Sequence, residues 1–338
     1  MLFITAYLIG ILLLPVKENI KNITSHNYFA WAEGVSASLI HKETADDTDN
    51  PVQETVKVDV SSIAPLVPVP RMKNGKKNEN ELIVWAKKAV VIDAESGEVL
   101  YQDKMLENHQ IASLTKTMTA LVLIDIVKDW NEKVSISQHA ASAGGATVHF
   151  LYGENFLAKD LLKAMLMNSD NTAARALAEH FGGSEEKFVE MMNEKVKELN
   201  LRNTKFADAA GLNDDDRSHS CAYDVAIIAK EELKHPLLLE VMQTPSHIEI
   251  VSRDEFSNVH RVGNTNKLLG QYPGILGAKT GFTYEAGYCL MMMKETANKG
   301  KLIGVVLDAG ENQRWTEMQK MLDWAFDRYS WSVFPKDK

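Results

Sequence analysis

The hydrophobic pattern becomes regular near Leu82 and stays regular almost to the end of the chain. The stretch "KAVVIDAESGEVLYQDK" holds two alternating apolar runs on either side of residues 95–98, which predicts a β-hairpin. Apolar runs of strand length return late in the chain and predict strands over 246–251, 275–282, 287–295 and 301–309.

Helical spacing of apolar residues separates and follows these strand groups. It predicts helices over 109–127, 157–168, 171–183, 184–200, 222–233 and 314–329. Ser184 stands where an N-cap is expected. The order of strand pair, helices, strand group and final helix predicts an α+β fold, in which a largely antiparallel sheet is covered by helices. The helices between the two strand groups are expected to form a mainly helical lobe.

The first residues form an uncharged apolar run, 2–15, which has the length of a signal-peptide core and is short for a membrane span. The small residues Ala30 and Ala32 fit a cleavage site. We therefore interpret 1–32 as a signal peptide or, because no basic residue precedes the run, as an uncleaved N-terminal anchor. A buried helix is the remaining alternative. Either of the first two interpretations predicts an extracytoplasmic protein, whether secreted, periplasmic or associated with the cell wall or membrane.

Residues 33–82 are polar, with charges and prolines and no helical period, which predicts a linker. Proline–valine spacing leaves a short edge strand as an alternative there. The pattern then predicts one folded domain over 83–330 and a tail over 331–338. The chain stops soon after its last helix, so we expect any membrane attachment to depend on the N-terminus.

Composition narrows the range of partners and cofactors. The chain has 338 residues and a formal net charge of −9, which argues against nucleic acid as a partner. Cys221 and Cys289 are too few for a disulfide framework, and two buried free thiols are favoured over a single bridge. No histidine lies in a spacing such as H-E-x-x-H, so His180 and His219 are interpreted as ordinary polar residues. We expect no metal ion and no other cofactor.

Three short motifs stand in order along the folded region. Ser113–Lys116 is an S-x-x-K motif, Ser169–Asn171 an S-x-N motif and Lys279–Gly281 a K-T-G motif. Each is weak alone, because S-x-x-K also occurs at Ser184–Lys187 and S-x-N at Ser25–Asn27. Their settings make the ordered set specific: the first motif opens an apolar helix, the second lies between two helices, and the third lies in a strand beside glycines.

The first motif fits a nucleophile with its base. A serine hydroxyl is a poor nucleophile until a base takes its proton, and a lysine is such a base only when its pKa falls toward neutrality. Burial and a nearby positive charge both lower the pKa of a lysine. The apolar helix predicts burial of Lys116, and Lys279 is the expected second charge. Ser113 is therefore the candidate nucleophile and Lys116 its base.

The other two motifs supply proton transfer and substrate binding. Ser169 is expected to relay a proton to the leaving group, and Asn171 to hold either a substrate amide or the Lys116 side chain. The expected role of Lys279 and Thr280 is to bind a substrate carboxylate. Gly281 leaves room for a substrate along its strand. The backbone N–H groups of Ser113 and Phe282 are expected to form an oxyanion hole.

The three motifs are those of the penicillin-recognising serine acyl-transferases. The flanking sequence resembles the low-molecular-mass D-alanyl-D-alanine carboxypeptidases over residues 85–328. The similar segments are "IASLTKTMTALV", "LLKAMLMNSDNTAARALAEHFGG", "FADAAGL" and "NTNKLLGQYPGILGAKTGFTYEAGYC". Two positions, Ala278 and Asp170, depart from that pattern. Ala278 stands where many relatives have a larger residue. Asp170 stands where many relatives have glycine, and aspartate at this position is common in transpeptidases and β-lactamases.

The resemblance implies a fold like that of the β-lactamases and transpeptidases. It also implies a serine carboxypeptidase that removes the terminal D-alanine from peptidoglycan stem peptides through an acyl-enzyme on Ser113. β-Lactam antibiotics would then be covalent inhibitors. By motif, the resemblance carries over the same residues: catalytic Ser113, Lys116 and Ser169, with the substrate-binding set Asn171, Lys279, Thr280, Gly281 and Phe282.

Three alternatives stay open. A D,D-endopeptidase that cuts peptide crosslinks would use the same site. A β-lactamase is less favoured, because the position of the glutamate that activates its deacylating water holds Val196 here, within an expected helix. The non-enzymatic alternative is a peptidoglycan-binding module on the same fold, which the loss of a motif residue would favour; none is lost.

Overall fold

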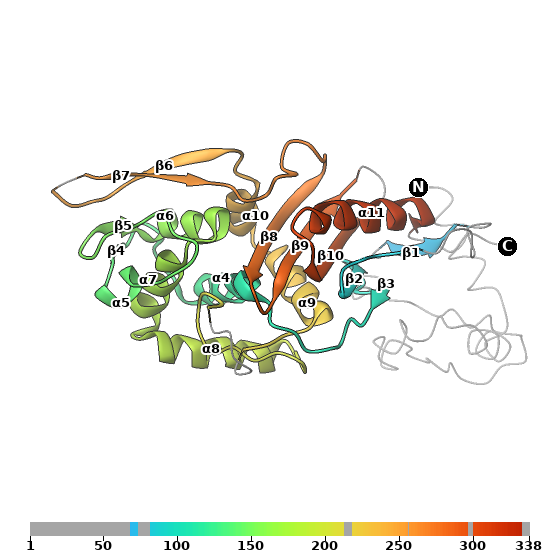
Figure 1. Ribbon diagram of the computed structural model, residues 1–338, viewed down its shortest axis with the longest axis horizontal. Coiled ribbons are helices and arrows are strands. Elements are labelled where there is room, and N and C mark those ends of the chain that lie inside the picture. Colours follow the sequence, from blue (N-terminus) through green and yellow to red (C-terminus); the bar gives the residue numbers. More distant parts are fainter. Residues whose placement is uncertain (1–67, 74–81, 213–217, 256, 297–299, 333–338) are drawn as a thin grey trace, which may run out of the picture. The chain divides into compact units, whose positions relative to one another are not determined.

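The structure is a computed structural model that describes residues 68–73, 82–212, 218–255, 257–296 and 300–332 (Figure 1). These residues belong to a compact unit, Val67–Lys338. The predicted signal peptide or anchor over 1–32, most of the predicted linker and the second S-x-N sequence at Ser25–Asn27 lie outside the described residues. Within the described residues, no helix has both the length and the apolar character needed to cross a bilayer.

A five-stranded antiparallel sheet forms the centre of the fold. Its strands, in spatial order, are β3 (Val99–Asp103), β2 (Lys88–Asp93), β10 (Lys301–Ala309), β9 (Gly287–Glu295) and β8 (Ile275–Thr283). The hairpin predicted around residues 95–98 is confirmed as the β2–β3 pair. Three of the four late strands predicted from the sequence lie in this sheet, with β8 at its edge.

Both faces of the sheet are buried, so strand residues alternate between two hydrophobic cores. Val90 and Ile92 face one core, together with helix α4 (Thr115–Ile126) and helix α9 (Ala222–Glu232). Ala89 and Val91 face the other, which helix α11 (Gln313–Arg328) covers. Figure 1 shows α11 and α9 on opposite sides of the sheet. This layering confirms the expected α+β class.

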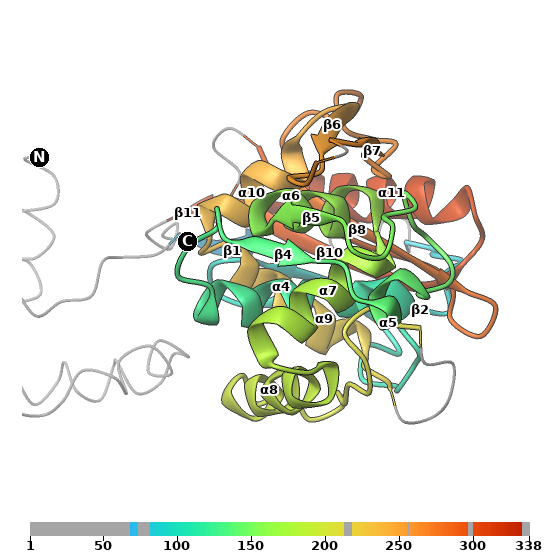
Figure 2. The same ribbon diagram turned by 90° about the vertical axis from the view of Figure 1, so that its left-hand side faces the viewer.

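The helices between the two strand groups form the predicted helical lobe, which faces the viewer in Figure 2. Its helices are α5 (Gln138–Ala141), α6 (Ala158–Lys163), α7 (Asn171–Gly182) and α8 (Glu185–Glu198), with a π-helical turn, η4 (Ala164–Asn168), between α6 and α7. It also contains the two-stranded sheet of β4 (Lys133–Ser135) and β5 (Asn155–Leu157). The predicted N-cap is confirmed, because the Ser184 side chain accepts a hydrogen bond from the Lys187 N–H.

Two further antiparallel strand pairs complete the described fold. Helix α10 (Pro236–Gln243) leads into the pair β6 (His247–Val251) and β7 (Val259–Gly263). Strand β1 (Val69–Met72) pairs with β11 (Tyr329–Ser332). β1 corresponds to the edge strand left open within the predicted linker, and β11 runs past residue 330. Regular structure therefore extends beyond the predicted domain bounds of 83–330 at both ends.

Two predicted helices are locally distorted where the motifs lie. The helix predicted over 109–127 begins as a 3-10 turn, η3 (Ala112–Leu114), and continues as α4. The helix predicted over 157–168 is α6 followed by the wider π-helical turn η4, which ends at Ser169 with φ 65°. Such widened turns are frequent at functional sites. Both distortions fall next to a motif serine.

Candidate active site

Ser113 and Lys116 lie where turn η3 passes into helix α4. Because residues three apart share one side of a helix, Lys116 Nζ comes to 2.8 Å from Ser113 Oγ. Ala112, just before the serine, has φ 47°, a left-handed conformation that non-glycine residues rarely adopt. Strain of this kind concentrates at functional sites, which supports the interpretation of Ser113 as the nucleophile.

The Lys116 side chain is fully buried and tied to two further oxygens. Its Nζ donates to Asn171 Oδ1 at 2.6 Å and to the carbonyl of Ala210 at 2.6 Å. The amide nitrogen of Asn171 in turn donates to the carbonyl of Gly144 at 2.6 Å, which turns the Asn171 oxygen toward the lysine. Of the two roles expected for Asn171, the geometry supports the one of holding Lys116.

Burial lowers the pKa of Lys116 to about 7. The carboxylates of Asp208 and Asp170 act in the opposite direction, and the cation that lowers this pKa further is Arg175. The expected repulsion between Lys116 and Lys279 is present: burial lowers the pKa of Lys279, and the charge of Lys116 lowers it further.

The second and third motifs meet through Ser169 and Lys279. Lys279 Nζ donates to Ser169 Oγ at 2.8 Å and to its neighbour's carbonyl, Thr280 O, at 2.9 Å. The Lys279 side chain is buried, and desolvation is the main reason that its pKa falls well below the usual value. Asp170, between the motif residues, caps α7 by accepting from the Ala173 N–H at 2.7 Å.

Strand β8 passes very close to the turn that carries the nucleophile. A Cβ atom placed on Gly281 would lie 2.8 Å from the carbonyl oxygen of Ile111 and 3.3 Å from the backbone nitrogen of Ser113. Glycine is therefore required at this contact. The next residue on the strand is Phe282, so the two backbone segments expected to form the oxyanion hole touch here. The three motifs come together in one site.

One partner of Lys116 was not predicted. The carbonyl of Ala210 is presented by a turn in which Asp208 accepts hydrogen bonds from the N–H groups of Ala210, Gly211 and Leu212. Gly211 has φ 77°, and a Cβ there would clash with the carbonyl of Ala112. The segment "FADAAGL" resembles the family, but its side-chain types do not reveal that one of its backbone carbonyls binds Lys116.

Two charged residues near Lys279 were also missed. Arg314, at the start of α11, donates from Nη1 to the carbonyl of Gly281 at 3.4 Å and stacks on Tyr288, with its Cζ 4.9 Å from the ring centroid. Glu232, at the end of α9, is fully buried, and neither carboxyl oxygen has a hydrogen-bond partner among the described residues. Burial raises the pKa of Glu232 to about 8, and the charge of Lys279 opposes this rise.

Several residues were expected to have no catalytic or metal-binding role, and their contacts agree with ordinary structural roles. Val196 lies within α8, which confirms the expected helix. His180 bonds to Glu132 with 2.8 Å between His180 Nε2 and Glu132 Oε1. Cys221 and Cys289 are free, buried thiols.

Comparison with known proteins agrees with this geometry. The family model described as D-alanyl-D-alanine carboxypeptidase matches residues 75–311. The D-alanyl-D-alanine carboxypeptidase DacF of Bacillus subtilis is 39% identical over 262 residues, which are 76% of this chain and 66% of that relative. The D-alanyl-D-alanine endopeptidase of Pseudomonas aeruginosa is 32% identical over 239 residues, 70% of this chain and 76% of the relative.

The fold is similar to solved structures of the same kind. The crystal structure of the Streptomyces K15 DD-transpeptidase superimposes with a TM-score of 0.69 at 25% sequence identity, covering 74% of this chain and 100% of that one. The matched region spans just under two thirds of the length of the DacF relative.

Proposed function

Because the chain belongs to the D-alanyl-D-alanine carboxypeptidase family of serine peptidases, we propose that it removes the terminal D-alanine from peptidoglycan stem peptides. The observation that carries this proposal is the set of three contacts around the buried Nζ of Lys116. The reaction proceeds outside the cytoplasm, where peptidoglycan is found. β-Lactam antibiotics acylate the same serine.

Burial favours the neutral form of Lys116, and its contacts are compatible with that form. A neutral amine has two N–H groups and one lone pair. The carbonyl oxygens of Asn171 and Ala210 only accept, so they use both N–H groups. The lone pair then faces the hydroxyl of Ser113. With a pKa of about 7, a substantial fraction of Lys116 is neutral near pH 7.

Acylation follows from this arrangement. Lys116 takes the hydroxyl proton as Ser113 Oγ attacks the carbonyl carbon of the penultimate D-alanine. The negative charge that develops on the carbonyl oxygen is stabilised by the backbone N–H groups of Ser113 and Phe282. The C–N bond then breaks, and the leaving D-alanine nitrogen takes a proton through Ser169, whose hydroxyl is bonded to Lys279. Water subsequently hydrolyses the ester, which restores Ser113.

The C-terminal carboxylate of the substrate is the group that selects the scissile bond. At one end of the site, two cations, Lys279 and Arg314, and the hydroxyl of Thr280 bind this carboxylate. Arg314 is suited to this role because a guanidinium forms paired hydrogen bonds with a carboxylate. Its Nη1 already lies beside the Gly281 carbonyl, at the contact between β8 and the nucleophile turn.

A D,D-endopeptidase is the second candidate, because the Pseudomonas aeruginosa relative carries that name. The two activities use the same chemistry and differ in whether the amine that leaves is free D-alanine or the side chain of a second stem peptide. A β-lactamase is disfavoured by Val196, which lies in α8 and has no carboxylate. A peptidoglycan-binding module without catalysis requires an inactive Ser113.

Labelling with a fluorescent penicillin tests the nucleophile. We expect covalent label on the wild type and none on Ser113→Ala. Ser184→Ala is the matched control, because it removes the serine of the other S-x-x-K sequence, whose role is to cap α8. An unlabelled, folded wild type would favour the binding module.

Incubation with purified muropeptides, followed by mass spectrometry, tests the reaction. Loss of one terminal D-alanine from monomers supports the carboxypeptidase. Conversion of crosslinked dimers into monomers without that loss would support the endopeptidase instead.

A further inference from the structure

The turn that presents the Ala210 carbonyl to Lys116 is held by one buried carboxylate. Asp208 is 4% exposed. Its Oδ1 accepts hydrogen bonds from the N–H groups of Ala210 at 2.7 Å, Gly211 at 2.5 Å and Leu212 at 3.1 Å. Hydrogen bonds to an ionised carboxylate are stronger than those between neutral groups, so this turn is firmly fixed. The reaction proposed above gives the Asp208 carboxylate no role.

The peptide unit between Ala210 and Gly211 joins Asp208 to the candidate base. The N–H group of this unit donates to Asp208. Its carbonyl accepts from Lys116 Nζ at 2.6 Å. A trans peptide directs its N–H and C=O groups in opposite directions, so the carboxylate and the amine lie at the two ends of one dipole. Linked hydrogen bonds polarise one another, so an anion at the N–H end makes the carbonyl a stronger acceptor.

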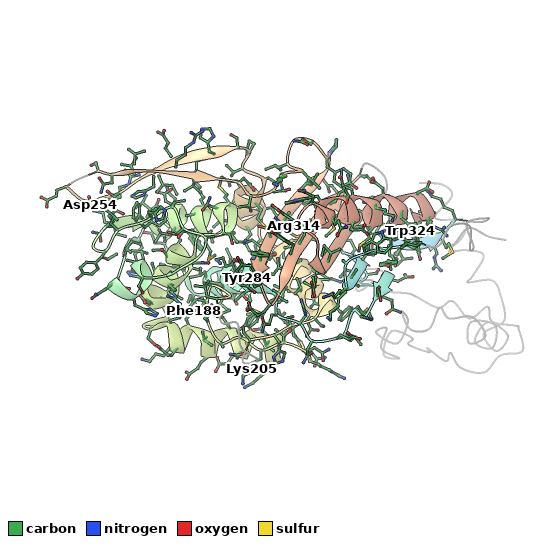
Figure 3. All side chains as sticks on the ribbon, viewed as in Figure 1. Phe188, Lys205, Asp254, Tyr284, Arg314 and Trp324 are labelled. Atoms are coloured by element: carbon green, nitrogen blue, oxygen red, sulfur yellow. The ribbon has the colours of Figure 1, made fainter. Side chains whose placement is uncertain are left out.

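Neighbouring helices hold this peptide unit in place. The carbonyl of Ala209 accepts from Thr119 Oγ1 at 2.7 Å, and Thr119 lies three residues after Lys116 on α4. Two successive carbonyls of the turn therefore bind side chains from the same side of α4. The Ala209 N–H donates to Glu185 Oε1, in the first turn of α8, at 3.1 Å. The segment that leads to the turn runs along α8, beside which Lys205 is labelled in Figure 3.

Other charged groups also act on Lys116, from the elements packed around it. Burial lowers the pKa of Lys116, the carboxylates of Asp208 and Asp170 oppose that fall, and Arg175 of α7 adds to it. From β8, the charge of Lys279 repels that of Lys116. Among these groups, Asp208 is the one that anchors the carbonyl to which Lys116 is bonded.

We propose that Asp208 is a positioning residue for the base Lys116. Through the peptide unit that it anchors, it aims the Ala210 carbonyl at Lys116 and so turns the lone pair of the amine toward Ser113. This inference rests on the proposed function, because it assumes that Lys116 activates Ser113. A base that is itself oriented by a third group is the general arrangement of an activated nucleophile. In this molecule the third group acts through a backbone peptide.

Two substitutions at Asp208 separate its shape from its charge. Asp208→Asn keeps an oxygen that accepts N–H groups but removes the negative charge that raises the pKa of Lys116. The midpoint of the pH profile for acylation by penicillin should therefore move to lower pH, by about 0.5 to 1 unit. The rate constant on the plateau should stay within about threefold of the wild type. Asp208→Ala also removes the acceptor, so its plateau should fall about 10- to 100-fold.

Asp224→Asn is the matched control. Asp224 is also buried, at 3% exposed, and accepts from the Asn203 N–H at 2.8 Å, so the same chemical change is made at a carboxylate that holds a different turn. This variant should keep the wild-type midpoint. Circular dichroism shows whether each variant is folded, and if Asp208→Ala does not fold, the midpoint of Asp208→Asn decides alone.

A purely structural role for Asp208 would leave the midpoint where it is. The inference is overturned if Asp208→Asn keeps the wild-type midpoint, or if the two Asp208 variants lose the plateau equally. Either result with a labelled wild type leaves the proposed function intact. A folded wild type that penicillin does not label would instead overturn the proposed function, and this inference with it.

Discussion

The two motif lysines occupy the same kind of position but differ in their partners. Lys116 and Lys279 are both buried, and the Nζ of each lies 2.8 Å from a serine hydroxyl. Lys116 is bonded to two carbonyl oxygens besides its serine, whereas Lys279 is bonded to one. Lys279 also interacts with the buried carboxyl group of Glu232.

This difference separates a base from a cation, because a substrate carboxylate bound at Lys279 raises the pKa of that lysine and favours its ammonium form. Two carbonyl acceptors use both N–H groups of a neutral Lys116 and leave its lone pair for Ser113. With one carbonyl and one hydroxyl as partners, Lys279 retains donor capacity for a substrate carboxylate, and Glu232 is the acidic group that responds to its charge. A buried lysine beside a serine is therefore not sufficient to identify the base; the number of pure acceptors around the amine is informative.

Removing the base gives the largest expected effect. Lys116→Ala should lower the rate constant for acylation by penicillin by about 1,000-fold or more, because it removes the base proposed to take the Ser113 proton. The measurement is the rate of covalent labelling, with circular dichroism to show that the variant is folded. Lys187→Ala is the matched control, from the S-x-x-K sequence that caps α8, and should label at the wild-type rate.

Exchange of each lysine for arginine separates the two roles. Arginine keeps a positive charge but is not deprotonated in proteins. Lys116→Arg should therefore lose acylation about as severely as Lys116→Ala. Lys279→Arg should lose only about 10- to 100-fold, because a cation is still present for the carboxylate. Equal losses in the two arginine variants, measured by penicillin labelling, would contradict the assignment of base and cation.

Glu232→Gln tests the buried acid that interacts with Lys279. The folded protein holds the Glu232 proton until about pH 8, whereas an unfolded chain releases it near its ordinary pKa of 4.5. Wild-type stability therefore falls as pH rises from about 5 to 8, by roughly 3 kcal/mol from this group. Glutamine cannot ionise, so the variant should gain stability relative to the wild type over that interval. Urea unfolding at several pH values measures the difference, and a constant difference would contradict it.

Arg314→Ala tests the carboxylate end of the site with a smaller effect. Losing a guanidinium–carboxylate contact should raise KM for a D-alanyl-D-alanine peptide by about tenfold. Amidation of the peptide's C-terminus should remove most of the difference between wild type and variant. Steady-state kinetics on the acid and amide forms of one peptide give both values. A variant that loses equally on the two forms would place the role of Arg314 elsewhere.

The sequence predicts those features of the site that depend on side-chain type and spacing. The three-residue spacing of Ser113 and Lys116 on a helix predicts their contact, and the motif order predicts the meeting with Ser169 and Lys279. The sheet and lobe follow from apolar periodicity. Even so, the 3-10 start of α4 and the π-turn before Ser169 were missed, because tightening or widening a single helical turn changes the apolar spacing too little to be recognised.

The missed residues share a physical reason. The acceptor at Ala210 is a backbone carbonyl, which every residue has, and its direction depends on the turn that Asp208 holds. Arg314 looks like an ordinary polar residue of an amphipathic helix until α11 is packed beside β8. The effect of Arg175 on Lys116 was also missed, because it depends on distances through the folded lobe.

The most direct test of Lys116 as a neutral base is the pH dependence of acylation. Protonated Lys116 cannot accept the Ser113 proton, so the second-order rate constant for penicillin labelling should rise about tenfold per pH unit below pH 7. It should then level off above the lysine pKa of about 7. A rate constant that does not change between pH 5 and pH 8 would contradict the assignment of Lys116 as the base.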